Sequence, residues 1–370
     1  MSGSIARDAT LNNATEFFSP DYVTARARFR AAAETAGAVL HALALDAAGP
    51  GGEALTIDIA RLGDPRARKV LLHTSGLHGV EAFAGSAIQL ALLQQPPAPA
   101  ADCALILVHV LNPYGMAWLR RANENNVDLN RNFLGDGETR SGAPDLYRRI
   151  DRFLNPPSPP ASDFFYLQAL WQALRHGFHP LKQAVAQGQY EFPCGVFFGG
   201  STLQQGPRRY LDWLRQHLSG ARYVFALDVH TGLGPWGEET LLPEPASGAT
   251  PIARLAAALN RKLIEVTRGD TAAYVIRGGM GGMLPRVLPG ATVDFVLQEL
   301  GTYSPLAVFR ALRDENRWHH YGSGGLEHPA KQRLREALCP AAREWRTQIV
   351  AKGIGLVHAA ADWTFRKRER

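Results

Sequence analysis

Residues 70–81 read Val-Leu-Leu-His-Thr-Ser-Gly-Leu-His-Gly-Val-Glu, so a short and mostly apolar run leads directly into a histidine and a glutamate. Three further runs rich in Val, Leu, Ile and Phe lie at 104–110, 223–229 and 293–298, separated by segments long enough for helices. Near-continuous apolar strands that alternate with helices predict an α/β fold. We expect a mixed, mostly parallel sheet with helices on both faces.

The composition allows one large core and excludes several classes of protein. The chain has 370 residues, of which 46% are apolar, so it is not a disordered chain. The net charge is +6, but only residues 366–370 are densely basic, which argues against a nucleic-acid partner. No apolar run approaches the roughly 18 residues of a membrane-spanning helix, so no membrane partner is expected.

The cysteines indicate a reducing compartment. Cys103, Cys194 and Cys339 are scattered, with neither a CxxC pair nor the spacing of a disulfide framework. The first twenty residues lack the apolar centre of a secretory signal. Together these features predict a cytoplasmic protein.

The proline- and glycine-rich segments of the chain are all short, which predicts a single domain over 1–370. We expect a helical segment at the N-terminus, about 1–45, in which residues 20–42 have an amphipathic helical pattern. A C-terminal helical extension is expected over about 328–370. The proline-rich stretch at 155–160 is too short for an interdomain linker and indicates a surface loop.

Chemically active side chains follow each predicted strand. His78 and Glu81 follow the first strand, Asn112 follows the second, His230 ends the third and Glu299 ends the fourth. In open α/β sheets, ligands bind beyond the carboxyl ends of the strands. These residues are therefore expected to meet at one edge of the sheet.

The residue types at this edge are those of a catalytic metal site. A catalytic zinc takes about three nitrogen or oxygen ligands and keeps one position open for water; His78, Glu81 and His230 supply that set. Glu299 is the candidate for a separate carboxylate that takes the proton from the bound water. Asp228 could orient a ligand, with core packing as the equal alternative. Taken singly these signals are weak, since one His-x-x-acid pair is expected by chance.

An arginine cluster between the second and third strands indicates an anionic substrate group. Arg131 is suited to capture a carboxylate, and Asn130 beside it adds a neutral donor. Arg121 could aim a second guanidinium at the oxygen that gains charge during the reaction. The alternative is that these are solvated surface charges. Because Arg120 and Arg121 are adjacent, which of the two faces the site stays open.

Taken in order, these motifs resemble the zinc carboxypeptidase superfamily over residues 73–303. The matching pieces are His78-x-x-Glu81, Asn112-Pro113-x-Gly115, Arg121-x-Asn123-x-x-x-Val127-Asp128-Leu129-Asn130-Arg131-Asn132-Phe133, His230 and Glu299. The resemblance implies a sheet of eight strands between helices. It also implies Zn²⁺ held by the two histidines and Glu81, with Glu299 as general base and acid. Finally, it implies Arg121 as the carbonyl-polarising group and Asn130 with Arg131 as the carboxylate clamp.

Two departures from the carboxypeptidase pattern affect the substrate. The stretch Asp-Val-His-Thr-Gly at 228–232 and the His-Gly-x-Glu at 78–81 are similar to the branch of succinylglutamate desuccinylase and aspartoacylase. Classical carboxypeptidases instead have Ser-x-His-x-Tyr around the third ligand. For their mobile tyrosine, Tyr274 and Tyr303 are both candidates here.

The sequence thus predicts a zinc-dependent hydrolase that cleaves a peptide or amide bond in a carboxylate-bearing substrate. The expected partner is a small peptide or an N-acyl amino acid. Alternatives are an N-acyl-amino-acid deacylase of the same superfamily and a non-catalytic binding protein on this fold. No G-x-S-x-G elbow and no phosphate-binding loop motif occurs. Side-chain preference would be set by loops 155–205 and 232–292, and the oligomeric state is not readable.

Overall fold

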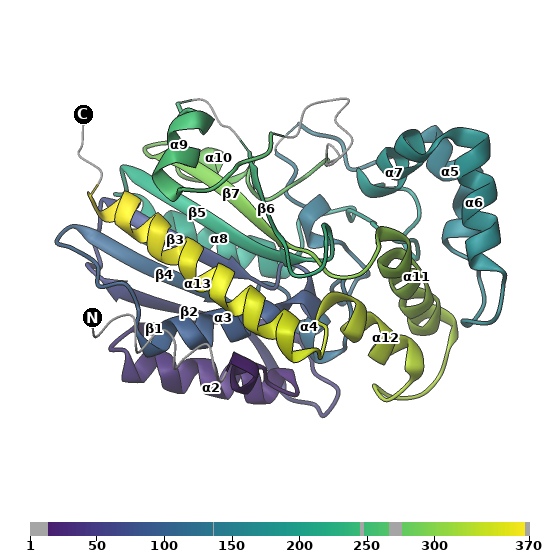
Figure 1. Cartoon of the computed structure of the whole chain (residues 1–370), viewed down its shortest axis with the longest axis horizontal. Helices are drawn as coiled ribbons and strands as arrows, with labels where there is room; N and C mark the ends of the chain where they lie inside the picture. Colours follow the sequence, from purple (N-terminus) through teal and green to yellow (C-terminus); the bar gives the residue numbers. More distant parts are fainter. Residues whose placement is uncertain (1–13, 136, 245–247, 266–275, 367–370) are drawn as a thin grey trace.

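The computed structural model describes residues 14–135, 137–244, 248–265 and 276–366, which form a mixed seven-stranded sheet flanked by helices (Figure 1). The strands are β1 Val39–Ala48, β2 Ala54–Gly63, β3 Lys69–Ser75, β4 Cys103–His109, β5 Tyr223–Thr231, β6 Glu239–Pro243 and β7 Thr292–Leu300. Their order across the sheet is β1-β2-β4-β3-β5-β7-β6. The four central strands β4, β3, β5 and β7 are parallel, and the outer pairings are antiparallel.

The four strands predicted from apolar runs are confirmed, and they are the four central parallel strands. These strands are buried almost throughout, which is why each reads as a continuous apolar run. The sequence prediction missed β1, β2 and β6. In β1 exposed and half-buried residues alternate, and β6 has only five residues, so neither gives a continuous apolar signal.

The expectation of eight strands is wrong for the described residues, which form seven. Beyond the edge strand β6, the chain makes a single bridge between Leu241 and Leu263. One bridge does not extend into a ladder of paired residues. The described part of the chain therefore adds no eighth strand there.

The N-terminal helix is shorter than predicted. Helix α2 covers Tyr22–Thr35, with the Asp21 side chain accepting a hydrogen bond from the Thr24 amide at its start. The chain then turns at Gly37, whose φ of 76° favours glycine, and β1 begins at Val39. The predicted helical segment over about 1–45 is therefore wrong at its C-terminal end, and residues 1–13 lie outside the described residues.

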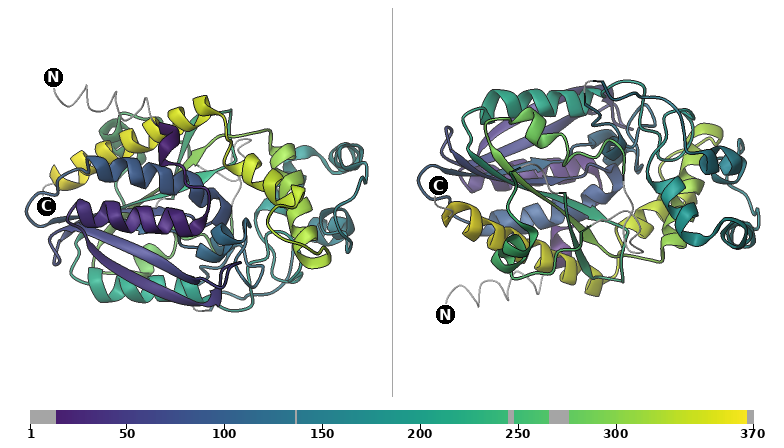
Figure 2. Two further views of the ribbon diagram at one scale, coloured as in Figure 1. Left: turned by 90° about the horizontal axis from the view of Figure 1, so that it is seen from below. Right: turned by 90° about the horizontal axis from the view of Figure 1, so that it is seen from above.

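Helices cover both faces of the sheet (Figure 2). One face packs against α8 Gln205–Leu218 and α10 Leu284–Val287. The opposite face packs against four helices: α2, α3 Ala82–Gln94, α9 Ile252–Leu259 and α13 Arg343–Arg366. Helices α12 Pro329–Leu338 and α13 lie in the region where a helical C-terminal extension was expected. In the described part of the chain, no helix is both long and apolar enough to cross a membrane.

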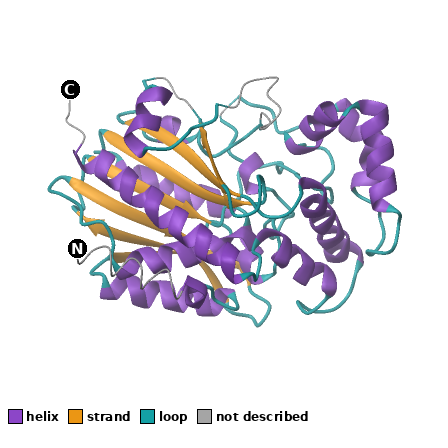
Figure 3. Cartoon of the chain, viewed as in Figure 1, coloured by secondary structure: helices purple, strands orange, loops and turns teal. Residues whose placement is uncertain are grey.

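The short 3₁₀ helix η1 Ala14–Phe17 packs with α3 and α13, and the other helices lie beyond the carboxyl ends of the parallel strands (Figure 3). Near the sheet, these are α4 Pro113–Ala117 and the short 3₁₀ turns η2 Gly79–Glu81 and η3 Leu129–Arg131. Farther out lie α5 Asp145–Leu154, α6 Phe165–His176 and α7 Phe178–Ala186, which we call the α5–α7 lobe, and α11 Pro305–Tyr321. The lobe has its own small core around Tyr147, Phe153 and Phe165. The edge of the sheet where the site was predicted is thus flanked by added helices.

Candidate metal centre

The two predicted histidine ligands and the predicted glutamate ligand converge at this edge. The Nδ1 atom of His78 lies 3.0 Å from Glu81 Oε1 and 3.1 Å from the Nδ1 atom of His230. The His230 Nδ1 atom lies 3.4 Å from Glu81 Oε2. All three side chains are buried, and their ligand atoms lie within 4.8 Å of one another, so they could hold a metal ion.

Main-chain packing fixes the turn that carries His78 and Glu81. The amide of Gly79 donates to the carbonyl of Arg121 at 3.1 Å, and the amide of Val80 donates to the carbonyl of Arg120 at 2.8 Å. A Cβ atom on Gly79 would lie 2.2 Å from the Cα atom of Gly115, so the two backbones touch. This contact explains why the Asn-Pro-x-Gly motif lies beside the metal ligands.

A carboxylate holds the outer nitrogen of each histidine ring. The Nε2 atom of His78 lies 3.0 Å from Asp128 Oδ1, and that of His230 lies 2.6 Å from Asp228 Oδ2. Asp228 in turn accepts a hydrogen bond from the Thr74 hydroxyl at 2.5 Å. Such carboxylate–histidine pairs turn the other ring nitrogen toward a metal. The structure places Asp228 where the sequence suggested; Asp128 was not singled out, although it lies in the most specific motif.

The electrostatics of the site favour positive charge between these groups. Burial alone would raise the pKa values of Glu81 and Asp128, but His78 and Arg121 outweigh it and lower both values. Burial would lower the pKa of His230, but Asp228 outweighs it and raises that pKa well above its usual value. Two imidazole nitrogens, one carboxylate and no thiolate form a donor set that suits catalytic zinc.

Glu299 lies on the strand next to His230 and directly opposite it in the β5–β7 register. Its carboxylate is buried and accepts a hydrogen bond from the Leu233 amide at 2.8 Å. Burial, reinforced by the charge of Glu81, raises the pKa of Glu299 to about 7. A carboxylate with a pKa near neutrality can both accept and return a proton at physiological pH.

The structure resolves which of the two adjacent arginines faces the site. Arg121 donates to Glu81 Oε1 at 2.7 Å and to Asp128 Oδ2 at 3.2 Å. Arg120 points the other way and donates from Nε to Glu315 Oε1 at 3.0 Å on α11. Arg121 is therefore the guanidinium of the metal centre, and Arg120 connects the site loop to α11.

The predicted carboxylate clamp has other partners in the structure. Arg131 is buried and donates to the carbonyl of Ala186 from Nε and Nη2, at 3.0 and 2.5 Å, and to the carbonyl of Asn130. The Asn130 side chain accepts a hydrogen bond from the Met280 amide at 3.3 Å. Arg131 thus holds the C-terminal end of α7. The ring of Phe197 lies 5.5 Å from the Arg121 guanidinium carbon and 5.7 Å from that of Arg131.

Phe197 lies in the segment 155–205, which was expected to be a loop but contains α6 and α7, and nothing in the sequence had singled this residue out. Its φ is 57°, which is unusual for an aromatic residue. Part of the segment 155–205 therefore lies beside Arg121 and Arg131, while its role in side-chain preference stays a prediction.

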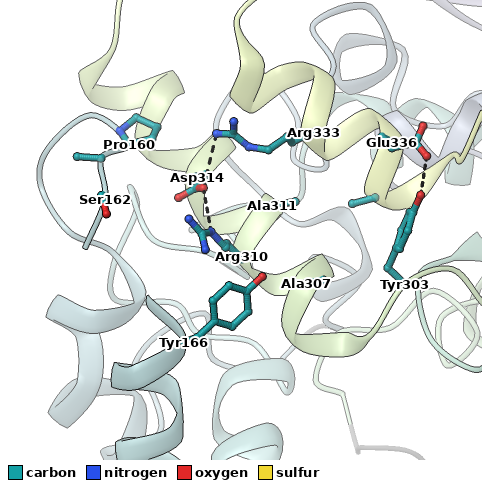
Figure 4. Close-up of a pocket in the computed structure, with 12 residues that line it drawn as sticks. Pro160, Ser162, Tyr166, Tyr303, Ala307, Arg310, Ala311, Asp314, Arg333 and Glu336 are labelled. Carbon is teal, nitrogen blue, oxygen red and sulfur yellow. Dashed lines mark hydrogen bonds and ion pairs between the residues drawn. The ribbon is translucent and has the colours of Figure 1, made fainter. Parts of the chain in front are cut away.

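Of the two tyrosine candidates, the structure describes only Tyr303. Tyr274 lies outside the described residues. Tyr303 donates its hydroxyl to Glu336 Oε1 at 2.6 Å and lines a cavity of about 550 Å³ with Tyr166, Arg310 and Asp314 (Figure 4). None of the three metal-centre ligands lines this cavity. Tyr303 therefore lines a cavity that the candidate metal ligands do not line.

Two other histidines on the strands are core residues. The Nδ1 atom of His73 accepts a hydrogen bond from the Gln89 side-chain amide at 3.2 Å, and burial lowers the pKa of His73 to about 4. His109 is bonded to the Ser86 hydroxyl at 2.9 Å and stacks on Phe29, and burial lowers its pKa to about 4 as well. Both histidines are fully buried and belong to the core.

Comparisons with known proteins give a family and several distant structures. The family model described as "Protein of unknown function (DUF2817)" matches residues 18–352. No curated protein sequence matches. A candidate metallopeptidase from Shewanella amazonensis SB2B is 17% identical, covering 86% of this chain and 94% of that one, with a TM-score of 0.44.

Two further solved structures belong to the kinds of protein that the motifs predicted. Carboxypeptidase A from Helicoverpa armigera is 14% identical, with 90% of this chain and 73% of that one covered and a TM-score of 0.42. The succinylglutamate desuccinylase of Chromobacterium violaceum is 14% identical, with 83% and 76% covered and a TM-score of 0.37. All three TM-scores lie below 0.5, so the function proposed below depends on the geometry of the candidate metal ligands.

Proposed function

The chain belongs to the DUF2817 family, and we propose that it is a zinc-dependent hydrolase that cleaves a peptide or amide bond in a small, carboxylate-bearing substrate. The observation that carries this proposal is the convergence of His78, Glu81 and His230, each histidine backed by its own carboxylate. A metal site with a purely structural role would not need a further buried carboxylate with a pKa near 7. Glu299 is that carboxylate.

His78 and His230 would bind the metal through Nδ1, and Glu81 through its carboxylate. When bound, zinc supplies a Lewis acid that polarises the substrate carbonyl and makes a water molecule more acidic. Glu299 takes a proton from the attacking water as the water oxygen bonds to the amide carbon. Arg121 donates hydrogen bonds to the carbonyl oxygen as it gains charge. Glu299 then returns the proton to the departing nitrogen, which leaves as an amine.

Asn130 and Arg131 remain our proposed site for the substrate carboxylate, with one condition set by the geometry. The Arg131 guanidinium already donates hydrogen bonds to the carbonyls of Asn130 and Ala186. A substrate carboxylate must therefore replace the Ala186 carbonyl as its partner. A bidentate carboxylate is a stronger acceptor than a neutral carbonyl, which favours this exchange. Substrate binding would then be coupled to the position of α7.

The proposal is tested by metal analysis and hydrolysis in the same preparations. We expect about one zinc per chain in the protein supplied with zinc, and loss of zinc and of hydrolysis in His78→Ala. Glu299→Gln should keep the zinc and lose about 10²–10⁴-fold in kcat, because only proton transfer is removed. His179→Ala, an exposed histidine in the α5–α7 lobe, is the matched control and should change neither.

Assays with N-blocked dipeptides and N-acyl amino acids in parallel separate the two hydrolase alternatives, because they place the larger group on opposite sides of the amide. A protein that takes up no metal when zinc is supplied would contradict the proposal and support a binding protein. Zinc binding with full activity in Glu299→Gln would contradict the role of Glu299 alone.

A further inference from the structure

The α5–α7 lobe carries the largest concentration of exposed apolar side chains in the described chain. Six of them lie between residues 164 and 178 and are more than half exposed. They are Phe164 (74%), Leu167 (66%), Leu170 (56%), Trp171 (53%), Leu174 (78%) and Phe178 (58%), which we call the α6 stripe. Four of the six lie on α6, Phe164 directly precedes it, and Phe178 begins α7. Single exposed apolar residues are ordinary, whereas such a concentration indicates a binding surface.

The stripe has the geometry of a helix–helix seam. Its members within α6 and at its start are spaced by three or four residues, which places them on one side of the helix. The opposite side of α6 is buried against the lobe through Phe165, Ala169 and Gln172. Helix α6 lies at the outer edge of the lobe (Figure 1). It therefore uses one face for folding and leaves a second apolar face exposed.

The exposed area matches what a dimer needs. Large side chains cover about 150–250 Å² each, so six that are more than half exposed present roughly 700 Å². A stable protein–protein interface buries about 800 Å² on each partner. Two copies of this stripe packed against each other would come close to that value, with the flanking polar residues of the lobe adding a rim.

The charges of residues 164–186, which carry the stripe and continue through α7, favour another protein surface over a lipid surface. Between residues 164 and 186 the chain carries two basic side chains, Arg175 and Lys182, and no acidic one. Arg175 lies over the Trp171 ring, with its guanidinium carbon 5.1 Å from the centroid. Anionic membranes are usually recognised by clusters of about four to eight Lys or Arg residues. Two basic residues in this segment are too few for such recognition, so an apolar protein surface fits the stripe better than an anionic membrane does.

We propose that the α6 stripe is the interface of a symmetric homodimer, in which α6 packs antiparallel against α6 of a second copy of this chain. In such a pair the centre of the stripe, near Leu170 and Trp171, lies on the twofold axis and meets its own copy. The metal ligands belong to other elements, so each copy keeps a complete metal centre. This proposal does not depend on the proposed function.

The first test measures the mass of the zinc-supplied protein by sedimentation at about 50 µM, well above the micromolar range of modest interfaces. The native protein should sediment as a dimer, and the double variant Leu167→Glu/Leu174→Glu as a monomer, since two buried carboxylates per copy would face each other. Val23→Glu, at an apolar position on α2 that is also more than half exposed, should remain dimeric. Circular dichroism and zinc content should be unchanged in all three proteins.

The second test measures directly whether α6 of one copy lies next to α6 of the other. Its variants are expected to fold like the native protein. Leu170→Cys, in a Cys194→Ser background that removes the exposed native thiol, should form a disulfide-linked dimer under mild oxidation. Val23→Cys in the same background should not. A native protein that is monomeric would overturn the proposal, as would a dimer that persists in the double variant. A monomer that binds vesicles of phosphatidylcholine and phosphatidylglycerol through the stripe would overturn it in favour of a membrane surface.

Discussion

The metal centre and the α5–α7 lobe depart from ordinary protein architecture in opposite ways. At the carboxyl edge of the sheet, charged groups such as Glu81, Asp128 and Asp228 are buried and held by hydrogen bonds. In the lobe, large apolar side chains are exposed. Buried charges cost folding free energy, and exposed apolar area attracts unwanted partners, so neither is kept without a use. The comparison teaches that the two regions present different chemistry: His78, Glu81 and His230 could hold a metal ion, whereas the lobe presents the apolar surface for which we propose a second copy as partner.

The largest effects are expected from substituting, one at a time, the two adjacent arginines Arg120 and Arg121. Arg120→Ala removes a buried guanidinium from Glu315 and Asn126 and should lower the free energy of unfolding by about 3–5 kcal/mol. Arg121→Ala should instead lower kcat/KM by about 10²–10³-fold, with a smaller loss of stability in the zinc-supplied protein. Urea unfolding and steady-state kinetics on both variants measure the difference. If the two variants exchanged these effects, the assignment of Arg121 to the site would be wrong.

A second prediction concerns the backbone contact beneath the ligands. Gly79→Ala places a methyl group about 2.2 Å from the Gly115 main chain, so the turn that carries His78 and Glu81 must shift. We expect a loss of about 1–3 kcal/mol in unfolding free energy, together with weaker zinc binding. Gly220→Ala, where the added methyl group meets open space, is the control and should change stability by less than about 0.5 kcal/mol. Unchanged zinc affinity in Gly79→Ala would show that the turn is not held by this contact.

A third, smaller effect tests whether the outer carboxylates belong to the metal centre. Asp228→Asn keeps the shape of the side chain but weakens the hold on the His230 ring, and should lower zinc affinity by about 10–100-fold. Competition with a chelator of known affinity measures the change. Asp212→Asn on the exposed face of α8 controls for the loss of one negative charge. Equal zinc affinities in the two variants would make Asp228 a core residue, the alternative that the sequence left open.

The sequence predicted the metal centre far better than the lobe, for physical reasons. Strands buried on both faces produce continuous apolar runs, so β3, β4, β5 and β7 and the polar residues after them could be located. The half-exposed strand β1 gave no such run and was assigned to a helix. The direction of each of two adjacent arginines depends on main-chain geometry that no local pattern carries. Asp128 could have been found, because it lies in the motif that named Asn130 and Arg131.

The helical pattern of α6 has two apolar faces, and sequence alone does not say which one meets the core. Only the fold shows that Phe165 and Ala169 are buried while Leu167 and Leu174 are exposed. An apolar residue that packs inside the monomer and one that packs between copies look the same in a single sequence. The stripe therefore became visible only when the exposure of each side chain was known.

The smallest effect is expected in the lobe, and it depends on protein concentration. Leu174→Gln changes a side chain that is 78% exposed, so the monomer should lose less than about 0.5 kcal/mol, whereas Leu214→Gln in the buried face of α8 should cost at least 2 kcal/mol. If α6 pairs two copies, the melting temperature of the native protein should rise with protein concentration, because association stabilises the folded state by mass action. The melting temperature of Leu174→Gln should rise less steeply. Parallel slopes for the two proteins in a dilution series would place the partner of this lobe elsewhere than in a second copy of the chain.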